Sequence, residues 1–274
     1  MNVLQAVVLG IVEGLTEFLP VSSTGHLLIA ERLLRLPMAS QAEKDSLLGF
    51  TAVIQVGAIA AAVVYFFKDI VTVLSSFFAG LTSAEKRRGP QWRFALAVAV
   101  GCLPIAFVGL LAKGLIKSID EHLVSVAIGL IVFSAVFVFA EKRGAQDRGE
   151  ASITVQDGLL IGLAQCIALV PGVSRSGATI SAGLLRGLDR VSATRLSFLL
   201  GIPALVGAGA LGLKDATAST TGVLPTIVAT AVAFVVAYAA IAFLLKFVTT
   251  HSIVAFVPYR LALGSAILIG LYAF

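Results

Sequence analysis

Six long apolar stretches constrain this chain more than any other feature of its sequence. They run over roughly 47–67, 94–112, 123–140, 196–213, 223–245 and 253–274, and Arg260 is the single charge within them. Each is close to the ~20 residues that a helix needs to cross a bilayer. Only 13% of all residues are charged, against about 25% in a soluble domain, which leaves too little polar surface to face water on every side. The sequence therefore predicts an all-α membrane protein with six transmembrane helices.

Two further apolar segments, 1–36 and 156–187, are interrupted near the middle by proline, small residues and polar groups. Each half has about 14 residues, which at 1.5 Å per residue is too short to span. Such halves can enter the membrane and return as a re-entrant helical hairpin, provided that the irregular backbone lies inside protein or a wet cavity. Glu13 and Glu17 stand where a signal peptide would be apolar, so we read the N-terminus as mature protein.

The distribution of Lys and Arg tests this topology. If both hairpins re-enter, one side of the membrane holds 12 cations: Lys68, Lys86, Arg87, Arg88, Arg93, Lys142, Arg143, Arg148, Arg186, Arg190, Arg195 and Lys246. The other side holds 6, namely Arg32, Arg35, Lys44, Lys113, Lys117 and Lys214. The positive-inside rule makes the first side cytoplasmic, so both termini are expected outside. The same rule explains the net charge of +5 without nucleic acid, for which no basic tract interleaved with aromatic residues is present.

The two halves of the chain resemble each other weakly. A shift of 152 positions superimposes Gly10 on Gly162, Glu13 on Gln165, and the residues Ser22–Gly25 on Ser174–Gly177. Each half, 1–145 and 150–274, then holds one hairpin and three spans. Because three is odd, the second copy is inverted, as in many transporters whose site lies at the midplane. We therefore predict one integral membrane domain over 1–274, built as an inverted-topology repeat.

Glu13 and Glu17 are spaced by four residues and share one helix face. Carboxylates in hydrocarbon are costly, so they are candidates for function by default. They would repel each other unless one holds a proton or a cation lies between them. General acid–base work and a divalent metal site are the two roles that follow. The alternative is that both lie in a wet vestibule or in the headgroup layer.

The run Ser22-Ser23-Thr24-Gly25-His26 opens the second half of the first hairpin. The hydroxyls of Ser22 and Thr24 could cap free N–H groups of this half-helix or bind a ligand. The same N–H groups favour a phosphate. Ser23 and His26 are three residues apart, so they could share a face, and a serine near an imidazole suggests an activated nucleophile.

Arg175 is the single charge between Gly158 and Leu185. An unpaired arginine is costly in the membrane, whereas its planar fork suits bidentate contact with phosphate. We expect four neighbours to complete an anion cradle, namely Ser174, Ser176, Gly177 and Thr179. The three hydroxyls would contact the anion, and Gly177 would allow its close approach to the backbone. The alternative is that Arg175 pairs with Glu13 or Glu17, which would also bring the two motifs together.

Three other features carry less information. Gln55 could donate to the site or pair between helices. Arg260, in the last span, could extend its charge toward the interface. The small residues of Gly201–Gly212 favour close helix packing.

Together, the hydroxyls, arginine, histidine and two carboxylates suit chemistry at an anionic phosphate centre. A site inside the bilayer favours a lipid substrate over a soluble one. Because broken helices and inverted repeats are also typical of transporters, a transporter or lipid flippase is the alternative function.

At these residues the sequence resembles the bacterial undecaprenyl-pyrophosphate phosphatase family associated with bacitracin resistance. The matching text is EGLTEFLPVSSTGH over 13–26, AVIQ over 52–55 and PGVSRSGAT over 171–179. The resemblance covers essentially the whole chain, and the two longer motifs together are highly specific.

The resemblance implies hydrolysis of undecaprenyl pyrophosphate to undecaprenyl phosphate and inorganic phosphate, which recycles the lipid carrier for cell-wall synthesis. It implies a location in the bacterial cytoplasmic membrane, a site open to the outer face, and a divalent cation, Mg²⁺ or Ca²⁺. The oligomeric state is open, with a homodimer among the alternatives. The implied roles are metal binding or proton transfer for Glu13 and Glu17, attack on phosphorus by Ser23 or His26, and pyrophosphate binding by Arg175. Ser174, Ser176 and Thr179 would line the site.

Overall fold

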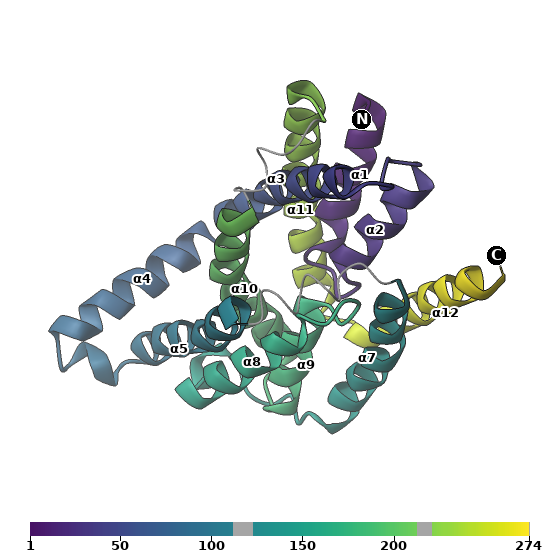
Figure 1. Cartoon of the computed structure of the whole chain (residues 1–274). Coiled ribbons are helices and arrows are strands. Elements are labelled where there is room, and N and C mark those ends of the chain that lie inside the picture. Colours follow the sequence, from purple (N-terminus) through teal and green to yellow (C-terminus); the bar gives the residue numbers. More distant parts are fainter. Residues whose placement is uncertain (112–122, 213–220, 274) are drawn as a thin grey trace. The chain divides into compact units, whose positions relative to one another are not determined.

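The computed structural model describes residues 1–111, 123–212 and 221–273, so the ends of three predicted spans (112, 213 and 274) and Lys113, Lys117 and Lys214 lie outside the described residues. The helices are α1 (Val3–Thr16), α2 (Ser23–Leu33), α3 (Gln41–Tyr65), α4 (Phe67–Thr82), η1 (Lys86–Arg88), α5 (Pro90–Leu111), α7 (Leu123–Arg143), η2 (Glu150–Ser152), α8 (Val155–Ile167), α9 (Arg175–Leu185), α10 (Arg190–Gly212), α11 (Val223–Phe247), η4 (Ile253–Phe256) and α12 (Val257–Ala273) (Figure 1). Extended pairing within the described ranges is limited to one isolated bridge between Arg148 and Leu188. The prediction of an all-α protein is confirmed.

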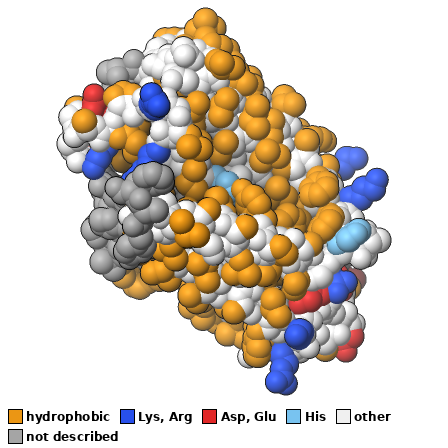
Figure 2. Space-filling model, turned by 90° about the vertical axis from the view of Figure 1, so that its right-hand side faces the viewer, with side chains coloured by type: hydrophobic (Ala, Val, Ile, Leu, Met, Phe, Trp, Pro, Cys, Tyr) orange, Lys and Arg blue, Asp and Glu red, His pale blue; other side chains and the backbone are white. Residues whose placement is uncertain are grey.

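Within the described ranges, six helical segments are long and apolar enough to cross a membrane, which agrees with the predicted number. They are α3, α5, α7, α10, α11 and the segment Ile253–Leu271. Large apolar side chains along them stay exposed, and Phe107 and Ile269 are each 67% exposed. Figure 2 shows apolar side chains over much of the visible face. A soluble monomer rarely exposes so much apolar surface, so this is a multi-pass membrane protein.

The first span begins earlier than the apolar pattern predicts, because its start is polar. The backbone N–H of Glu43 donates to Ser40 Oγ at 3.3 Å, and the N–H of Ser40 donates to Glu43 Oε2 at 2.9 Å. This reciprocal capping box satisfies N–H groups at the start of α3. Helix α3 therefore begins at Gln41 rather than near 47.

Helix α4 has no counterpart among the predicted elements. Its 16 residues are too few to span and are interrupted by polar side chains, so a search for long apolar runs misses it. Its apolar side chains recur at helical spacing on one exposed stripe, formed by Phe67, Val71, Leu74, Phe78 and Leu81. Beside this stripe, Phe77 stacks on Trp92 of α5 with ring centroids 5.6 Å apart, and Gly80 leaves room for the indole.

Both interrupted segments form pairs of short helices, as predicted. Helices α1, α2, α8 and α9 have 14, 11, 13 and 11 residues, and each pair packs on itself. The serines that precede the second helix of each pair have nearly equal left-handed backbone angles, with φ of 76° at Ser22 and 75° at Ser174. Such angles are uncommon outside glycine, and these serines coincide under the shift of 152. Re-entry into the membrane remains a prediction.

The chain divides into two compact units. The first comprises Met1–Leu19, Ser23–Tyr65 and Ile202–Leu244, and the second comprises Pro20–Ser22, Phe66–Gly201 and Leu245–Phe274. Two of their boundaries fall within α10 and α11, and the others lie at the first helix break and between α3 and α4. The units therefore differ in extent from the predicted repeats.

Within each unit, the first helix of a hairpin packs closely on a long helix. In the first unit a Cβ at Gly10 of α1 would lie 2.5 Å from the carbonyl oxygen of Ala229 in α11. In the second unit a Cβ at Gly162 of α8 would lie 2.0 Å from the carbonyl oxygen of Gly101 in α5. Each hairpin thus packs on the second span of the other predicted repeat. The repeat itself stays a prediction.

Arg260 is fully buried in the second unit, so the prediction that it extends toward the interface is wrong. Its guanidinium lies 4.7 Å from the Phe137 ring centroid. The acceptors of its N–H groups are the carbonyl oxygens of Pro20 at 2.9 Å, Gly172 at 3.0 Å, Val173 at 3.3 Å and Gly129 at 3.3 Å, and Ser134 Oγ at 3.2 Å. Arg260 therefore satisfies carbonyl groups that both helix breaks leave without helical partners.

Several loop cations that the sequence interprets only as topology signals form ion pairs. The buried carboxylate of Asp157, in the first turn of α8, lies 2.6 Å from Arg148 and 2.7 Å from Arg186. Burial raises the pKa of Asp157, but hydrogen bonds from Arg148, from the Thr154 backbone and from Arg186 outweigh burial and hold the pKa well below its usual range. Arg195 joins Asp69 at 2.5 Å and Glu150 at 2.8 Å, and Arg190 pairs with Glu141. These pairs connect the segments around the start of hairpin α8–α9.

Candidate functional site

Glu17 and Ser23 form the central contact of the first unit's polar motif. Ser23 Oγ donates a hydrogen bond of 2.7 Å to Glu17 Oε2. Glu17 is buried at the C-terminal cap of α1, and Ser23 is the half-buried first residue of α2. A carboxylate that accepts the proton of a serine hydroxyl is an arrangement that activates the oxygen for attack.

Glu13 lies one turn before Glu17 on α1 and is 1% exposed. Among the described residues, its Oε1 atom has no hydrogen-bond partner. A buried carboxylate oxygen without a partner is costly. Glu13 is therefore poised to hold a proton or to bind a cation, the two roles predicted for it.

Three other predicted site residues of the first unit lie on α2 and α3. His26 is half-buried on α2, three residues after Ser23, while Thr24 is exposed. Gln55 is half-buried on α3, which packs on α1. The hydrogen bond to Glu17 makes Ser23 a candidate nucleophile, and His26 stays the alternative.

Glu31 is a buried acid of this unit that the sequence analysis missed. It lies near the C-terminal end of α2, outside the six spanning helices, and burial raises its pKa to about 7. The opposing effect of Arg32 is smaller. An acid within the run between Leu27 and Leu36 is the signal that could have identified it.

In the second unit, Ser174 caps α9. Its Oγ accepts a hydrogen bond from the Gly177 N–H at 3.3 Å and lies 3.2 Å from Ser176 Oγ. Ser174 holds a left-handed φ although it is not glycine, and such strain persists where the surroundings fix it, often at functional sites. The start of α9 is a helix N-terminus, whose dipole favours an anion.

Thr179 and Gly177 have contacts within the protein that favour positioning roles. Thr179 Oγ1 lies 2.9 Å from the Arg175 carbonyl oxygen and 2.5 Å from Ser197 Oγ on α10. A Cβ at Gly177 would lie 2.4 Å from the Phe137 ring. The glycine therefore lets α9 pack on α7, whereas the sequence suggests a close approach to phosphate.

Arg175 is the first residue of α9, and its guanidinium lies against the backbone of α10. A Cβ at Gly201 would lie 1.5 Å from Arg175 Nη1. No local pattern indicates this role of Gly201, which the sequence places among the small residues Gly201–Gly212 that favour helix packing. That interpretation suits Gly209, where a Cβ would lie 3.1 Å from Ile59 Cδ1 of α3.

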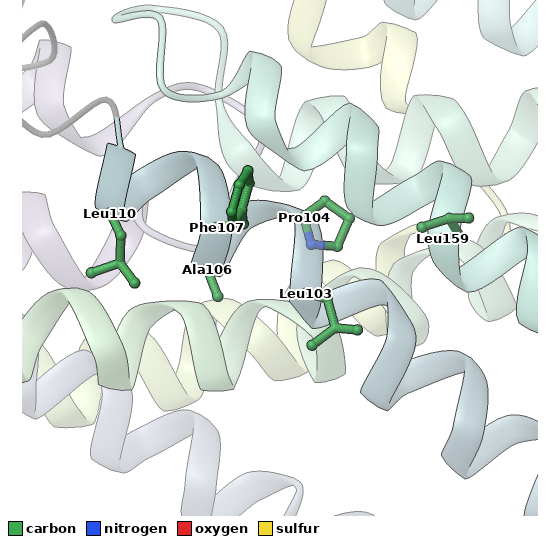
Figure 3. A pocket seen from close by; sticks show the side chains of 6 residues that line it. All are labelled: Leu103, Pro104, Ala106, Phe107, Leu110 and Leu159. Atoms are coloured by element: carbon green, nitrogen blue, oxygen red, sulfur yellow. The ribbon is translucent and has the colours of Figure 1, made fainter.

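An apolar groove follows α5 at Pro104 and reaches α8 (Figure 3). Its volume is about 520 Å³, and it is lined by Leu103, Pro104, Ala106, Phe107, Leu110 and Leu159. Because the described residues that line it are all apolar, this groove can contact lipid chains.

The predicted metal site has two carboxylates, Glu13 and Glu17. Over the ranges that the structure describes, no group of three or more His, Cys, Asp or Glu side chains could hold an ion. Mg²⁺ is commonly held by one or two carboxylates together with substrate phosphates, rather than by a cage of protein ligands alone. The two glutamates and the partnerless Glu13 oxygen fit that mode.

Fold and site together define a polytopic helical membrane protein with a serine–carboxylate pair in one hairpin and an arginine-led anion motif in another. The chain belongs to the family described as bacitracin resistance protein BacA, whose model matches residues 6–266. An undecaprenyl-diphosphatase 1 of Streptomyces avermitilis is 53% identical, covering 98% of this chain and 96% of the relative. An undecaprenyl-diphosphatase 1 of Streptomyces coelicolor is 54% identical, covering 95% and 92%. An undecaprenyl-diphosphatase of Corynebacterium diphtheriae is 48% identical, covering 95% and 91%.

Proposed function

We propose that this chain is an undecaprenyl-diphosphatase, which converts undecaprenyl pyrophosphate to undecaprenyl phosphate and inorganic phosphate. The observation that carries the proposal is the 2.7 Å hydrogen bond from Ser23 to Glu17, in a chain about half identical to relatives of that name over nearly its full length. The product would supply the lipid carrier for cell-wall synthesis.

The residues divide the chemistry between them. Glu17 takes the proton of Ser23 while Ser23 Oγ attacks the terminal phosphorus, and the bond from that phosphorus to the bridging oxygen breaks. Undecaprenyl phosphate leaves, and water then hydrolyses the phosphoserine to release inorganic phosphate and restore the serine. His26 is the alternative nucleophile. Arg175 and the N–H groups that open α9 hold the negative charge of the diphosphate.

A divalent cation, Mg²⁺ or Ca²⁺, is part of the proposal. Glu13 and Glu17 would hold it together with diphosphate oxygens. When bound, the cation would neutralise charge on the phosphoryl groups.

The proposed orientation places both termini outside the bacterial cytoplasmic membrane and opens the site to the outer face. The excess of cations in the loops assigned to the inside supports it. A cysteine introduced between Ala84 and Gln91 should react with an impermeant maleimide only after the cells are opened. Labelling of intact cells would refute the orientation.

The activity is tested with detergent-purified protein and a long-chain prenyl pyrophosphate. Phosphate release is expected with Mg²⁺ or Ca²⁺, and Ser23→Ala and Arg175→Met should each abolish it while leaving the melting temperature close to that of the parent protein. Rapid acid quenching should trap a phosphoserine at position 23. Phosphate on His26 would reassign the nucleophile, and no release with any divalent cation would refute the function.

A lipid flippase is the second candidate. The exchanged packing of α1 on α11 and α8 on α5, together with the matched φ angles of Ser22 and Ser174, favours an inverted repeat of the transporter kind. Proteoliposomes with the Ser23→Ala variant should then move intact lipid pyrophosphate between leaflets. Absence of transport would remove this candidate.

A further inference from the structure

Gln165 is a buried polar residue to which the proposed chemistry assigns no task. It lies in the last turn of α8 and is 0% exposed, on the face that also buries Gly158, Ile161 and Gly162. Across the described part of the chain, neither Oε1 nor Nε2 of its amide has a hydrogen-bond partner.

Burying the Gln165 amide without hydrogen-bond partners is costly, and an apolar side chain could fill the same space. A buried amide without partners loses its hydrogen bonds to water and gains none in the protein. The great majority of buried side-chain polar atoms are satisfied, so an exception calls for a physical reason. Methionine has a similar length without the amide, and packing alone would be served as well or better by it. A ligand that uses the amide would supply the missing partner.

The position of Gln165 places it at the end of the hairpin that carries the anion motif. Its backbone carbonyl accepts a hydrogen bond of 3.0 Å from the N–H of Ala168, where α8 gives way to the break. The break ends at Ser174, which caps α9 in front of Arg175. Helices α8 and α9 pack on each other within the second unit. The amide and the anion motif therefore flank the same break.

Gln165 also corresponds to Glu13. The shift of 152 that pairs Ser22 with Ser174 pairs these two residues, and each is buried in the closing turns of the first helix of its hairpin. The difference is chemical. A carboxylate can exchange a proton or hold a cation, whereas a neutral amide offers N–H donors and does not repel an anion.

We propose that Gln165 is a substrate-positioning residue whose Nε2 donates a hydrogen bond to an oxygen of the diphosphate held by Arg175 and the start of α9. The inference rests on the proposed phosphatase function and deepens it. The two hairpins would then be specialised, with Glu13 handling protons or a cation and Gln165 binding the anion. Inorganic phosphate, the reaction product, should use the same donor.

The test compares Gln165→Met with the parent protein. The Michaelis constant for a long-chain prenyl pyrophosphate and the inhibition constant for inorganic phosphate should both rise about tenfold or more, as expected for the loss of one hydrogen bond to a charged group. kcat should change much less. The melting temperature should not fall, and we expect a rise of about 2–4 °C from removing a partnerless buried amide.

Two further variants sharpen the result. Gln165→Glu keeps the shape of the side chain but adds negative charge, so it should weaken phosphate inhibition more than Gln165→Met does. It also tests the inference if the methionine variant does not fold. Ser181→Ala is the matched control, because the Ser181 hydroxyl is likewise buried without a partner among the described residues. It should leave both constants unchanged.

Unchanged constants for both substrate and phosphate in folded Gln165→Met or Gln165→Glu would overturn the inference. A purely structural role predicts that outcome together with a lower melting temperature. The two proposals fail differently. Parent protein that releases no phosphate refutes the phosphatase function, whereas active parent protein with insensitive Gln165 variants refutes only the role of Gln165.

Discussion

Replacing Arg260 by methionine should destabilise the second unit strongly, because its guanidinium donates hydrogen bonds to carbonyl groups of both helix breaks. The substitution keeps an apolar chain of similar length and removes every N–H donor. The carbonyl groups of Pro20 and Gly172, which accept bonds of 2.9 and 3.0 Å, would lose this partner inside the protein.

The expected magnitude follows from these contacts. A buried carbonyl left unsatisfied costs about 1–3 kcal/mol. Because carbonyl groups of both breaks lose a partner, we expect a total loss of about 3–5 kcal/mol. For a chain of this size that corresponds to a fall in melting temperature of roughly 6–20 °C.

Thermal unfolding in detergent, followed by circular dichroism, measures this fall. Arg88→Met is the matched control, because Arg88 is exposed on η1, and such surface changes stay within about 0.5 kcal/mol. Arg260→Lys should recover less than half of the loss, since one ammonium group cannot serve acceptors spread around a planar fork. An Arg260→Met protein that melts within about 2 °C of the parent would refute the reasoning.

Two predictions concern residues that the sequence analysis missed. Gly201→Ala should lower phosphatase activity about a hundredfold, because the added methyl group displaces the Arg175 guanidinium. The melting temperature should change little, since the flexible end of Arg175 can move and the backbone need not. Gly207→Ala is the control, because a Cβ at Gly207 of the same helix meets open space; equal activities of the two variants would contradict this account. The pKa of Glu31 is raised from 4.5 to about 7, so the fold disfavours its ionised form, and stability should fall as pH rises from 4.5 to 7 and then level off. Glu31→Gln should match the parent near pH 4 and exceed it by about 2–3 kcal/mol near pH 8, and parallel stability–pH curves would show that Glu31 is not the cause.

The long elements and the breaks could be predicted because they depend on local composition. Uninterrupted apolar runs identify α5, α7 and α11, and proline with small polar residues identifies the interruptions near Pro20 and Pro171. Helix α4 escaped because its apolar residues form a stripe rather than a run, and the start of α3 escaped because the capping pair of Ser40 and Glu43 is polar.

The sequence predicts which residues belong to the candidate site better than it predicts the contacts between them. Spacing indicates that Ser23 and Glu17 belong to one motif, but the hydrogen bond between them depends on how the chain folds back at the break. The burial of Arg260 and the space that Gly201 leaves for Arg175 arise from segments far apart in sequence. No local pattern encodes such contacts, so they had to be seen in three dimensions.

The bonds of Arg260 also bear on how the protein is made. Pro20 and Arg260 are separated by 240 positions, so at about 5–20 residues per second the ribosome needs roughly 12–48 s to deliver the arginine after the proline. The Gly172 carbonyl waits for the last 88 positions of that interval. Until Arg260 arrives, the carbonyl groups at both interruptions lack their final partner and would be costly in hydrocarbon. The hairpins should therefore remain in contact with water or the insertion machinery until the last helix emerges, and chains truncated before residue 260 should be preferred targets for membrane proteases.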